Sequence, residues 1–141
     1  MDSSTIALVK ESHGWVIPIS EQAADIFYRR LFEIAPEVRL LFKGDPKEQG
    51  RKLMATIAVV VNSLDRLDQV LPAVKDLAVR HLGYGVRNEH YDVVGTALIW
   101  TLMTGLGDRF TEAHKAAWTE TYAALSGVMR AAVSEARDAA E

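Results

Sequence analysis

Helix signals recur along the whole chain, and this feature restricts the possible fold more than any other. Residues that favour a helix start are repeatedly followed by apolar residues three and four positions apart. The clearest case begins with Asp45, a capping carboxylate, and Pro46, which suits the first helical position, and continues through Leu53 and Val60. Residues 57–61 have strand propensity, but they lie inside this helical period. The sequence therefore predicts an all-α fold.

The same reasoning predicts about seven helices without an internal repeat. Ser20, Asn88 and Thr111 are expected to cap three of them. Pro72 is compatible with its helix only if it lies in the first turn. The tail over residues 134–141 is rich in alanine and charge and is expected to fray. The expected helices cover residues 5–16, 20–32, 36–42, 46–62, 68–82, 88–105 and 111–132.

Length and composition limit what such a fold can do. With 141 residues, 49% of them hydrophobic, the chain is expected to form one domain over residues 1–141, with its core at about 5–133. The formal net charge of −3 disfavours nucleic-acid binding as the main activity. Because the chain has no cysteine, any metal must be bound by His, carboxylate, Tyr or Met rather than by thiolates.

Neither a targeting segment nor a membrane span is predicted. The N-terminus carries Asp2 and Glu11 and lacks the basic and apolar regions of a secretory signal. The longest uncharged stretch, residues 93–107, has only 15 residues and contains several glycines and threonines. A transmembrane helix needs about 20 apolar residues, so this stretch is expected to be a buried helix. We therefore expect a cytoplasmic protein.

The four histidines are the first candidates for a metal ligand in a chain without cysteine. His13, His90 and His114 lie beside helix starts or among polar neighbours, and we expect their side chains to be solvated. His81 differs, because it shares the apolar face of its helix with Leu77. A lone histidine on such a face is more often a hydrogen-bonded core residue than a ligand. Both interpretations remain open on this pattern alone.

Motifs for several other chemistries are missing from the sequence. It has no His-Glu-x-x-His motif and no pair of histidines at helical spacing, which argues against a zinc hydrolase. No serine lies in a Gly-x-Ser-x-Gly motif, which argues against a serine hydrolase. The Gly-x-Gly segments at residues 83–85 and 105–107 both follow helices, so they are expected to end helices rather than bind phosphate.

A set of separate segments, taken in order, resembles the globin family. The resemblance covers residues 5–129 and is greatest to single-domain bacterial globins and to the globin domain of flavohaemoglobins. It implies a globin fold around a haem pocket. The segments are Phe27-Tyr28-Arg29-Arg30-Leu31-Phe32, Pro36-Glu37-Val38-Arg39-Leu40-Leu41-Phe42, Gln49, Arg80-His81, Tyr91-Asp92-Val93-Val94-Gly95 and Ala117-Trp118.

The resemblance implies one b-type haem (heme b, iron protoporphyrin IX), held non-covalently because no Cys-x-x-Cys-His attachment motif is present. His81 would be the axial ligand to the iron, with the opposite position open to a gas. Phe42 would pack against the porphyrin face, although ordinary core packing explains it equally. Four further apolar residues are equally compatible with lining the haem pocket and with ordinary core packing. These are Leu53, Val86, Val94 and Leu98.

Tyr28 and Gln49 would lie on the side of the haem where the gas binds. A phenol hydroxyl and an amide that donate hydrogen bonds to bound dioxygen stabilise its partial negative charge. The function implied is reversible dioxygen binding at high affinity, for transport, storage or scavenging. The alternative for Tyr28 is a core tyrosine bonded to a backbone carbonyl.

Two other functions are compatible with the same resemblance. One is nitric oxide detoxification, in which nitric oxide and dioxygen give nitrate; since 141 residues leave no room for the reductase of flavohaemoglobins, a separate reductase is expected. The other is a gas-sensing globin that acts through a partner. Nitric oxide, carbon monoxide and dioxygen are the candidate ligands. A globin-like bundle without haem is the structural alternative.

Three further positions bear on these alternatives. Tyr91 matches a tyrosine beside the axial histidine of flavohaemoglobins, but a structural role at the start of its helix is equally compatible. Where that family places a glutamate on the same side of the haem, this chain has Val133, which argues against strong electron donation to the iron. Lys52 could reach a haem propionate, although a solvated surface lysine is the more common case.

Overall fold

The computed structural model describes residues 2–42, 44–83 and 87–140, and no strand occurs among them. Six α-helices account for most of the chain, which confirms the all-α prediction. They are joined in part by short 3₁₀ helices at Ile17–Ile19, Pro36–Leu41, Leu64–Arg66 and Gly107–Arg109. The α-helices are α1 (Ser3–Val16), α2 (Ser20–Ile34), α3 (Pro46–Asn62), α4 (Leu67–Gly83), α5 (Asn88–Leu106) and α6 (Glu112–Ala140).

The count of six rather than about seven has a local cause. The segment predicted as a short helix, residues 36–42, is a 3₁₀ helix over Pro36–Leu41. It ends because Phe42 has an extended backbone, with φ −99° and ψ 104°. The amide of Phe42 donates to the carbonyl of Arg39, at the three-residue step of a 3₁₀ turn.

Two of the four predicted helix starts are confirmed and two are wrong by one residue. The Asp45 carboxylate accepts from the amide of Lys47 at 3.1 Å, and Thr111 immediately precedes α6. Ser20 lies inside α2 rather than capping it, because the preceding 3₁₀ turn has already brought its backbone into the helical region. Asn88 is likewise the first helical residue of α5, and Arg87 is the N-cap.

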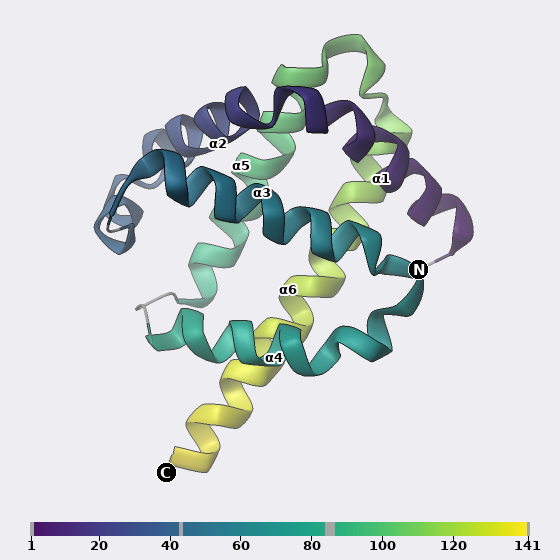
Figure 1. Ribbon diagram of the computed structural model, residues 1–141. Helices are drawn as coiled ribbons and strands as arrows, with labels where there is room; N and C mark the ends of the chain where they lie inside the picture. Colours follow the sequence, from purple (N-terminus) through teal and green to yellow (C-terminus); the bar gives the residue numbers. More distant parts are fainter. Residues whose placement is uncertain (1, 43, 84–86, 141) are drawn as a thin grey trace.

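One further expectation about helices is wrong. Pro72 lies inside α4, beyond its first turn. Proline removes the amide that would bond to the carbonyl of Asp68, and since both residues are exposed, water can reach that carbonyl. The tail from Ser134 continues α6 as a helix through Ala140, and its fraying stays a prediction. In Figure 1 this end of α6 extends past α4 to the C-terminus.

Replacing Asp45 with alanine is expected to lower the free energy of unfolding by about 1 kcal/mol. The substitution removes the side-chain acceptor at the start of α3, and the site is exposed, so no packing is lost. Urea unfolding followed by circular dichroism measures the change. Asp45→Asn keeps an acceptor and should stay close to the wild type. Equal stability of Asp45→Ala and the wild type would show that the cap contributes nothing.

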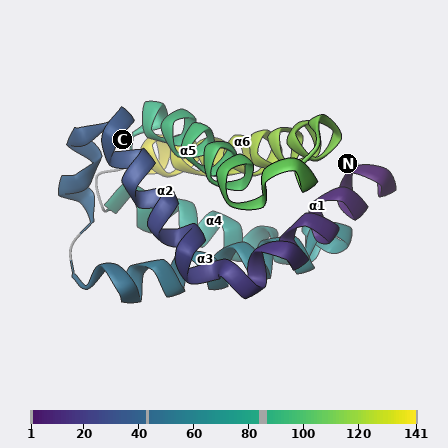
Figure 2. The same cartoon turned by 90° about the horizontal axis from the view of Figure 1, so that it is seen from above.

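The helices form two layers, seen from the side in Figure 2. α5 and α6 lie side by side in one layer, and α3 lies on the opposite side of the molecule. α2 contacts both α3 and α5, α4 packs on α6, and α1 also packs on α6. Trp118 of α6 donates from Nε1 to Ser12 Oγ of α1 at 2.7 Å, a buried hydrogen bond between distant parts of the chain.

Two glycines allow helices to approach closely. A Cβ at Gly50 of α3 would lie 3.0 Å from the Cβ of Ala24 in α2. A Cβ at Gly95 of α5 would lie 2.6 Å from the ring of Tyr122 in α6, which is too close for any side chain without a shift. Glycine is therefore required at the α5–α6 contact for Tyr122 to keep its position. Within the described part of the chain, no helix is long and apolar enough to cross a membrane.

Candidate functional site

An apolar cavity of about 160 Å³ lies between the two layers, bounded by α2, α3, α4, α5 and α6. Four residues singled out from the sequence line it: Leu53, Tyr91, Val94 and Leu98. The sequence analysis did not single out most of the other lining residues as pocket residues. Their apolar helical spacing was the available signal. They include Ile57, Val60, Val74, Leu77, Leu125 and Met129.

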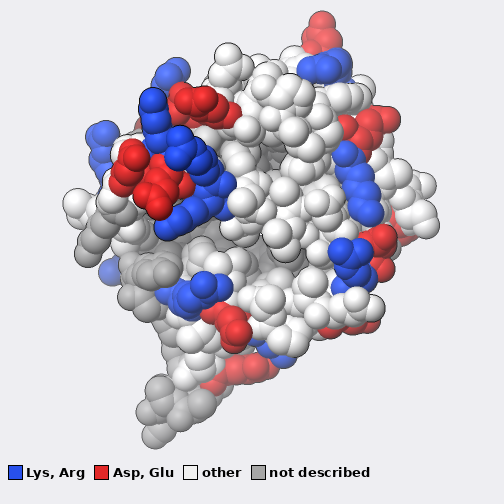
Figure 3. All heavy atoms as spheres, in the orientation of Figure 1, with Lys and Arg blue, Asp and Glu red and all other residues white. Residues whose placement is uncertain are grey.

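The face formed by α3 and α4 is uncharged in its middle. No charged residue occurs between residues 53 and 64, which form most of α3 and the turn after it. Figure 3, in the orientation of Figure 1, shows charged side chains mainly around the periphery of this face. The cavity wall behind this face is itself apolar, which favours an apolar occupant.

His81 lies in the last turn of α4 and is half-buried. Its ring Nδ1 is 2.8 Å from the backbone carbonyl oxygen of Leu77, one helical turn earlier. A carbonyl oxygen can only accept, so Nδ1 carries the proton in this contact and the neutral ring has its lone pair at Nε2. Leu77 itself lines the cavity. The local helix geometry thus orients a potential nitrogen ligand beside the cavity wall.

Tyr28 and Phe42 belong to a cluster of aromatic rings at the other end of the site. The Tyr28 ring centroid lies 5.3 Å from that of Phe42 and 5.2 Å from that of Phe27, both in edge-on geometry. Phe32 completes the cluster. Burial raises the pKa of Tyr28 to about 12, so its hydroxyl keeps its proton at neutral pH.

Gln49 and Lys52 lie on the first turns of α3, close to Tyr28. The Tyr28 hydroxyl donates to the backbone carbonyl of Gln49 at 3.3 Å, so the structure brings these residues together through the main chain. The Lys52 side chain is 76% exposed and its ammonium is 3.8 Å from the Glu48 carboxylate, in keeping with a surface lysine. Val86 lies outside the described residues.

The part of the chain that the structure describes separates the proposed site residues into two groups. Leu53, Tyr91, Val94 and Leu98 form part of the cavity wall, whereas five others are absent from the described lining. Two of the five adjoin it along the chain, since Tyr28 follows the lining residue Phe27 and His81 follows Leu77 by one turn. The five residues are Tyr28, Phe42, Gln49, Lys52 and His81.

Tyr91 has an unusual hydroxyl group. The residue is buried, and among the described residues its hydroxyl oxygen has no hydrogen-bond partner. Burial raises its pKa, while the nearby Arg130 guanidinium, 5.4 Å from the ring centroid, acts in the opposite direction. Val133 is buried in a small apolar cluster with Ala132 and with Ala78 of α4, and it is absent from the described lining of the cavity. A buried hydroxyl without a partner is rare and marks a position where a bound group could accept from it.

The prediction that His13, His90 and His114 are solvated is wrong, because all three are buried. His90 and His114 each turn back to accept a backbone amide at the start of a helix, from Arg87 at 2.9 Å and Thr111 at 3.1 Å respectively. His114 also lies 2.8 Å from a Glu11 carboxylate oxygen. Burial lowers the pKa of His13. His114 thus joins α6 to α1, while His90 stabilises the start of its own helix. No group of three metal-binding side chains occurs among the described residues.

Comparison with known families decides which fold this arrangement represents. The globin family model matches residues 25–129, which include α3 to α5 and most of α2 and α6. The chain belongs to the globin family. Globins are haem proteins that bind gases at the haem iron, so family membership supports haem and gas binding by this chain.

Curated relatives of this globin are flavohemoproteins. One from Rhodopirellula baltica is 30% identical over 131 residues, covering 91% of this chain and 32% of its own length. One from Vibrio cholerae is 33% identical over 119 residues, covering 79% of this chain and 30% of its own length. The globin chain therefore spans about a third of the length of these relatives.

Solved structures show the same fold. An engineered carbene transferase from Rhodothermus marinus, whose parent has a provisional assignment as a nitric oxide dioxygenase, is 28% identical, with a TM-score of 0.85 and coverage of 99% of this chain and 96% of its own. A bacterial globin from Campylobacter jejuni is 24% identical, with a TM-score of 0.86 and coverage of 97% and 99%. The latter supports the fold alone.

The residues present fit a haem in three respects. The cavity walls are apolar, as the porphyrin ring requires. The His81 ring has the tautomer of a nitrogen ligand, set by the Leu77 carbonyl. The Tyr91 hydroxyl is a buried donor without a partner among the described residues that surround it.

Proposed function

We propose that this globin holds one haem b through His81 and binds dioxygen reversibly with high affinity. The observation that carries the proposal is the contact of His81 Nδ1 with the Leu77 carbonyl. This contact lies beside an apolar cavity within a globin fold. Hydrogen bonding at Nδ1 restrains ring rotation and leaves the ligand lone pair at Nε2. Bound haem would supply the iron at which dioxygen binds.

The remaining residues would raise the affinity for dioxygen and exclude water from the site. Leu53, Val94 and Leu98 exclude water from the cavity wall, which strengthens any hydrogen bond made inside. The Phe42 ring would restrain the porphyrin while supporting Tyr28 from the edge. Tyr28 would donate its hydroxyl hydrogen to the gas, and the Gln49 amide would add a second donor. Lys52 could pair with a haem propionate because its ammonium is exposed.

A second candidate function is the conversion of nitric oxide to nitrate with dioxygen. It is favoured by the similarity over nearly the whole chain to the Rhodothermus protein and by the flavohemoprotein relatives. The electrons would come from a separate reductase. Val133 argues against strong electron donation to the iron, since no carboxylate stands at that position to polarise His81. Oxygen binding is therefore the first proposal.

Haem titration of the purified chain tests the proposed function. We expect an intense Soret band that saturates at one haem per chain, and a reduced form that converts to a stable oxygenated spectrum in air. Absence of stoichiometric haem binding would refute the proposal. Nitrate yield, measured with nitric oxide and a flavin reductase present, separates the two candidates: turnover at a rate far above that of free haem would favour the second.

A further inference from the structure

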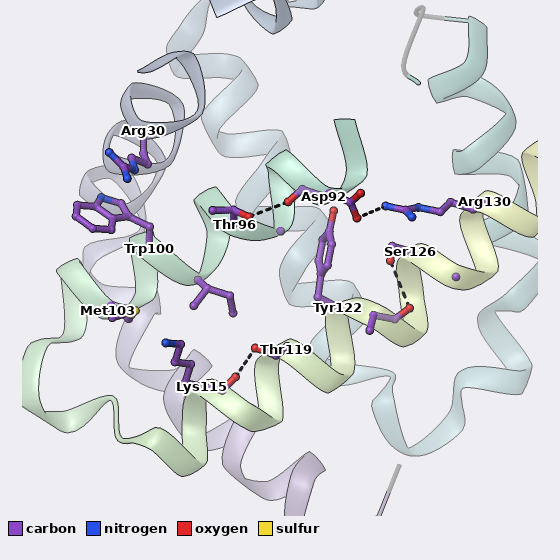
Figure 4. A pocket seen from close by; sticks show the side chains of 14 residues that line it. Arg30, Asp92, Thr96, Trp100, Met103, Lys115, Thr119, Tyr122, Ser126 and Arg130 are labelled. Carbon is purple, nitrogen blue, oxygen red and sulfur yellow. Dashed lines mark hydrogen bonds and ion pairs between the residues drawn. The ribbon is translucent and has the colours of Figure 1, made fainter. Parts of the chain in front are cut away.

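A surface groove separate from the inner cavity runs between α5 and α6. Its volume is about 740 Å³, within the range of about 300–1,000 Å³ that small-molecule sites occupy. Figure 4 shows Trp100 and Met103 along α5 on one side and Thr119, Tyr122 and Ser126 along α6 on the other. The groove is thus large enough and long enough for a molecule of several rings.

The groove exposes two large apolar side chains to solvent. Trp100 and Met103 are each 42% exposed although both are large and apolar. The guanidinium carbon of Arg30 lies 4.2 Å from the Trp100 ring centroid, so one face of the indole is held by a cation. An oriented, partly exposed aromatic ring is a suitable platform for a flat apolar ligand.

The charge of the groove is opposite to that of the whole chain. Arg30, Lys115 and Arg130 line it, whereas Asp92 is the one acidic residue among the described lining residues. The whole chain has a formal net charge of −3. Lys115 has no ion pair within the described structure, and Figure 4 shows its side chain extending between the two helices. The groove is therefore a cationic site on an acidic protein.

Both arginines have hydrogen-bonding capacity left over. Arg30 contacts Glu33 at 3.3 Å and Arg130 contacts Asp92 at 2.6 Å, in each case through a terminal nitrogen. The Nε atoms of both arginines are buried and lack a hydrogen-bond partner among the described residues. Buried donors of this kind are costly to leave unpaired, and a carboxylate is the acceptor that suits a guanidinium.

The groove and the inner cavity are adjacent but distinct. Tyr122 and Ser126 line both, so they form part of the wall between them. The Tyr122 hydroxyl donates to the backbone carbonyl of Tyr91, which fixes the ring against Gly95. A molecule in the groove would therefore lie outside the space assigned to the haem.

We propose that the α5–α6 groove binds a small amphipathic carboxylate, with its flat apolar part beside Trp100 and its anionic group held by Lys115, between the ion-paired Arg30 and Arg130 at the two ends of the groove. A second copy of the chain fits less well. A symmetric contact through this groove would bring the same three cations of both copies together, which is unfavourable. The proposal does not depend on the proposed haem function.

Calorimetric titration of the full chain with naphthalene-2-carboxylate, with and without added haem, tests the site. We expect one binding site per chain, with affinity falling as salt is added because the contact is ionic. Naphthalene-2-carboxamide has the same ring system without the charge and should bind at least about tenfold more weakly. Absence of binding heat at millimolar carboxylate, or equal affinity for the two compounds, would overturn the proposal.

Three variants locate the binding. Gly127 lines the groove, is exposed, and a Cβ built on it meets no atom within 4 Å, so Gly127→Leu should narrow the groove and weaken binding. Gly14 of α1 has the same open surroundings outside the groove, so Gly14→Leu should bind as the wild type does. Leucine has a higher helix propensity than glycine, so neither leucine variant should have a lower melting temperature than the wild type. Lys115→Gln should weaken binding about three- to tenfold without breaking an ion pair in the described structure.

The same variants identify other occupants. Unchanged carboxylate binding in Gly127→Leu would place the ligand elsewhere, including the inner cavity if haem is not held there, and would overturn the proposal. Sedimentation showing a dimer that Gly127→Leu dissociates, without carboxylate binding, would assign the groove to a second copy. Weaker carboxylate binding in Gly127→Leu but not in Gly14→Leu, with the same haem spectrum in both variants, is the result that supports the site.

Discussion

Replacing Tyr28 with phenylalanine is expected to raise the dioxygen dissociation rate constant about ten- to a hundredfold. The expectation rests on the proposed haem site, where the Tyr28 hydroxyl would donate to the bound gas. A hydrogen bond to a charged acceptor in a buried site contributes about 1.5–3 kcal/mol. The substitution removes only the hydroxyl oxygen, so the edge-on contacts with Phe27 and Phe42 can remain.

The present hydrogen bond of Tyr28 does not compete strongly with that role. The hydroxyl donates to the Gln49 carbonyl at 3.3 Å, whereas O–H···O bonds are usually about 2.7–2.8 Å. Rotation of the hydroxyl towards a stronger acceptor therefore costs little. Because burial raises the pKa of Tyr28 to about 12, the hydroxyl remains a donor across the neutral range, and the difference between variant and wild type should not change between about pH 6 and 9.

Stopped-flow displacement of dioxygen measures this effect. Tyr122→Phe is a matched control, since it removes another half-buried tyrosine hydroxyl that donates to a backbone carbonyl, that of Tyr91. The control should leave the dissociation rate within about twofold of the wild type, because its hydroxyl is occupied. An unchanged rate in Tyr28→Phe would mean that this tyrosine only supports the fold of α2 against α3.

Replacing Leu31 with alanine is expected to lower the free energy of unfolding by about 2–5 kcal/mol. Leu31 is 0% exposed and belongs to the core cluster of Phe27, Ala35, Val38 and Ala97. It lies on α2, which packs against α5, and two of its neighbours are alanines whose side chains cannot extend to fill the space. The substitution would therefore leave a cavity as well as losing buried apolar area.

Denaturant unfolding of the two leucine variants provides the measurement. Leu40→Ala makes the same chemical change at a residue that is 79% exposed, so its stability should lie within about 0.5 kcal/mol of the wild type. The slope of free energy against denaturant should be the same in all three proteins if only the folded core changes. A loss below about 1 kcal/mol for Leu31→Ala would contradict the packing described here for α2 and α5.

Features that depend on neighbouring residues could be predicted from the sequence. Asp45 caps α3 because its carboxylate needs only the amide two residues ahead. The predictions for Ser20 and Asn88 miss by one residue for an equally local reason, since in each case the preceding residue takes the cap position. The apolar spacing of α3 and α5 also placed Leu53, Val94 and Leu98 on the side that lines the cavity.

The three histidines show where such reasoning fails. Polar neighbours in the sequence suggested that His114 is solvated, yet the ring lies 5.1 Å from Trp15, a residue about a hundred positions earlier, and bonds to Glu11. Burial of a polar side chain depends on what packs over it, which sequence neighbours do not specify. The cationic α5–α6 groove was missed for the same reason, because Arg30 reaches Trp100 from another helix.

The sequence by itself determined the all-α class, most helix limits, the exclusion of thiolate chemistry and the resemblance to globins. Hydrogen bonds within one turn and the three-to-four spacing of apolar residues are local properties, so they can be recognised along the chain. Only the tertiary structure decided that Tyr28 meets Gln49 through its backbone, that the Tyr91 hydroxyl is buried without a partner in the described structure, and that three cations line one groove between α5 and α6. These depend on how separate helices cross, because the crossing sets both which side chains meet and which are shielded from water.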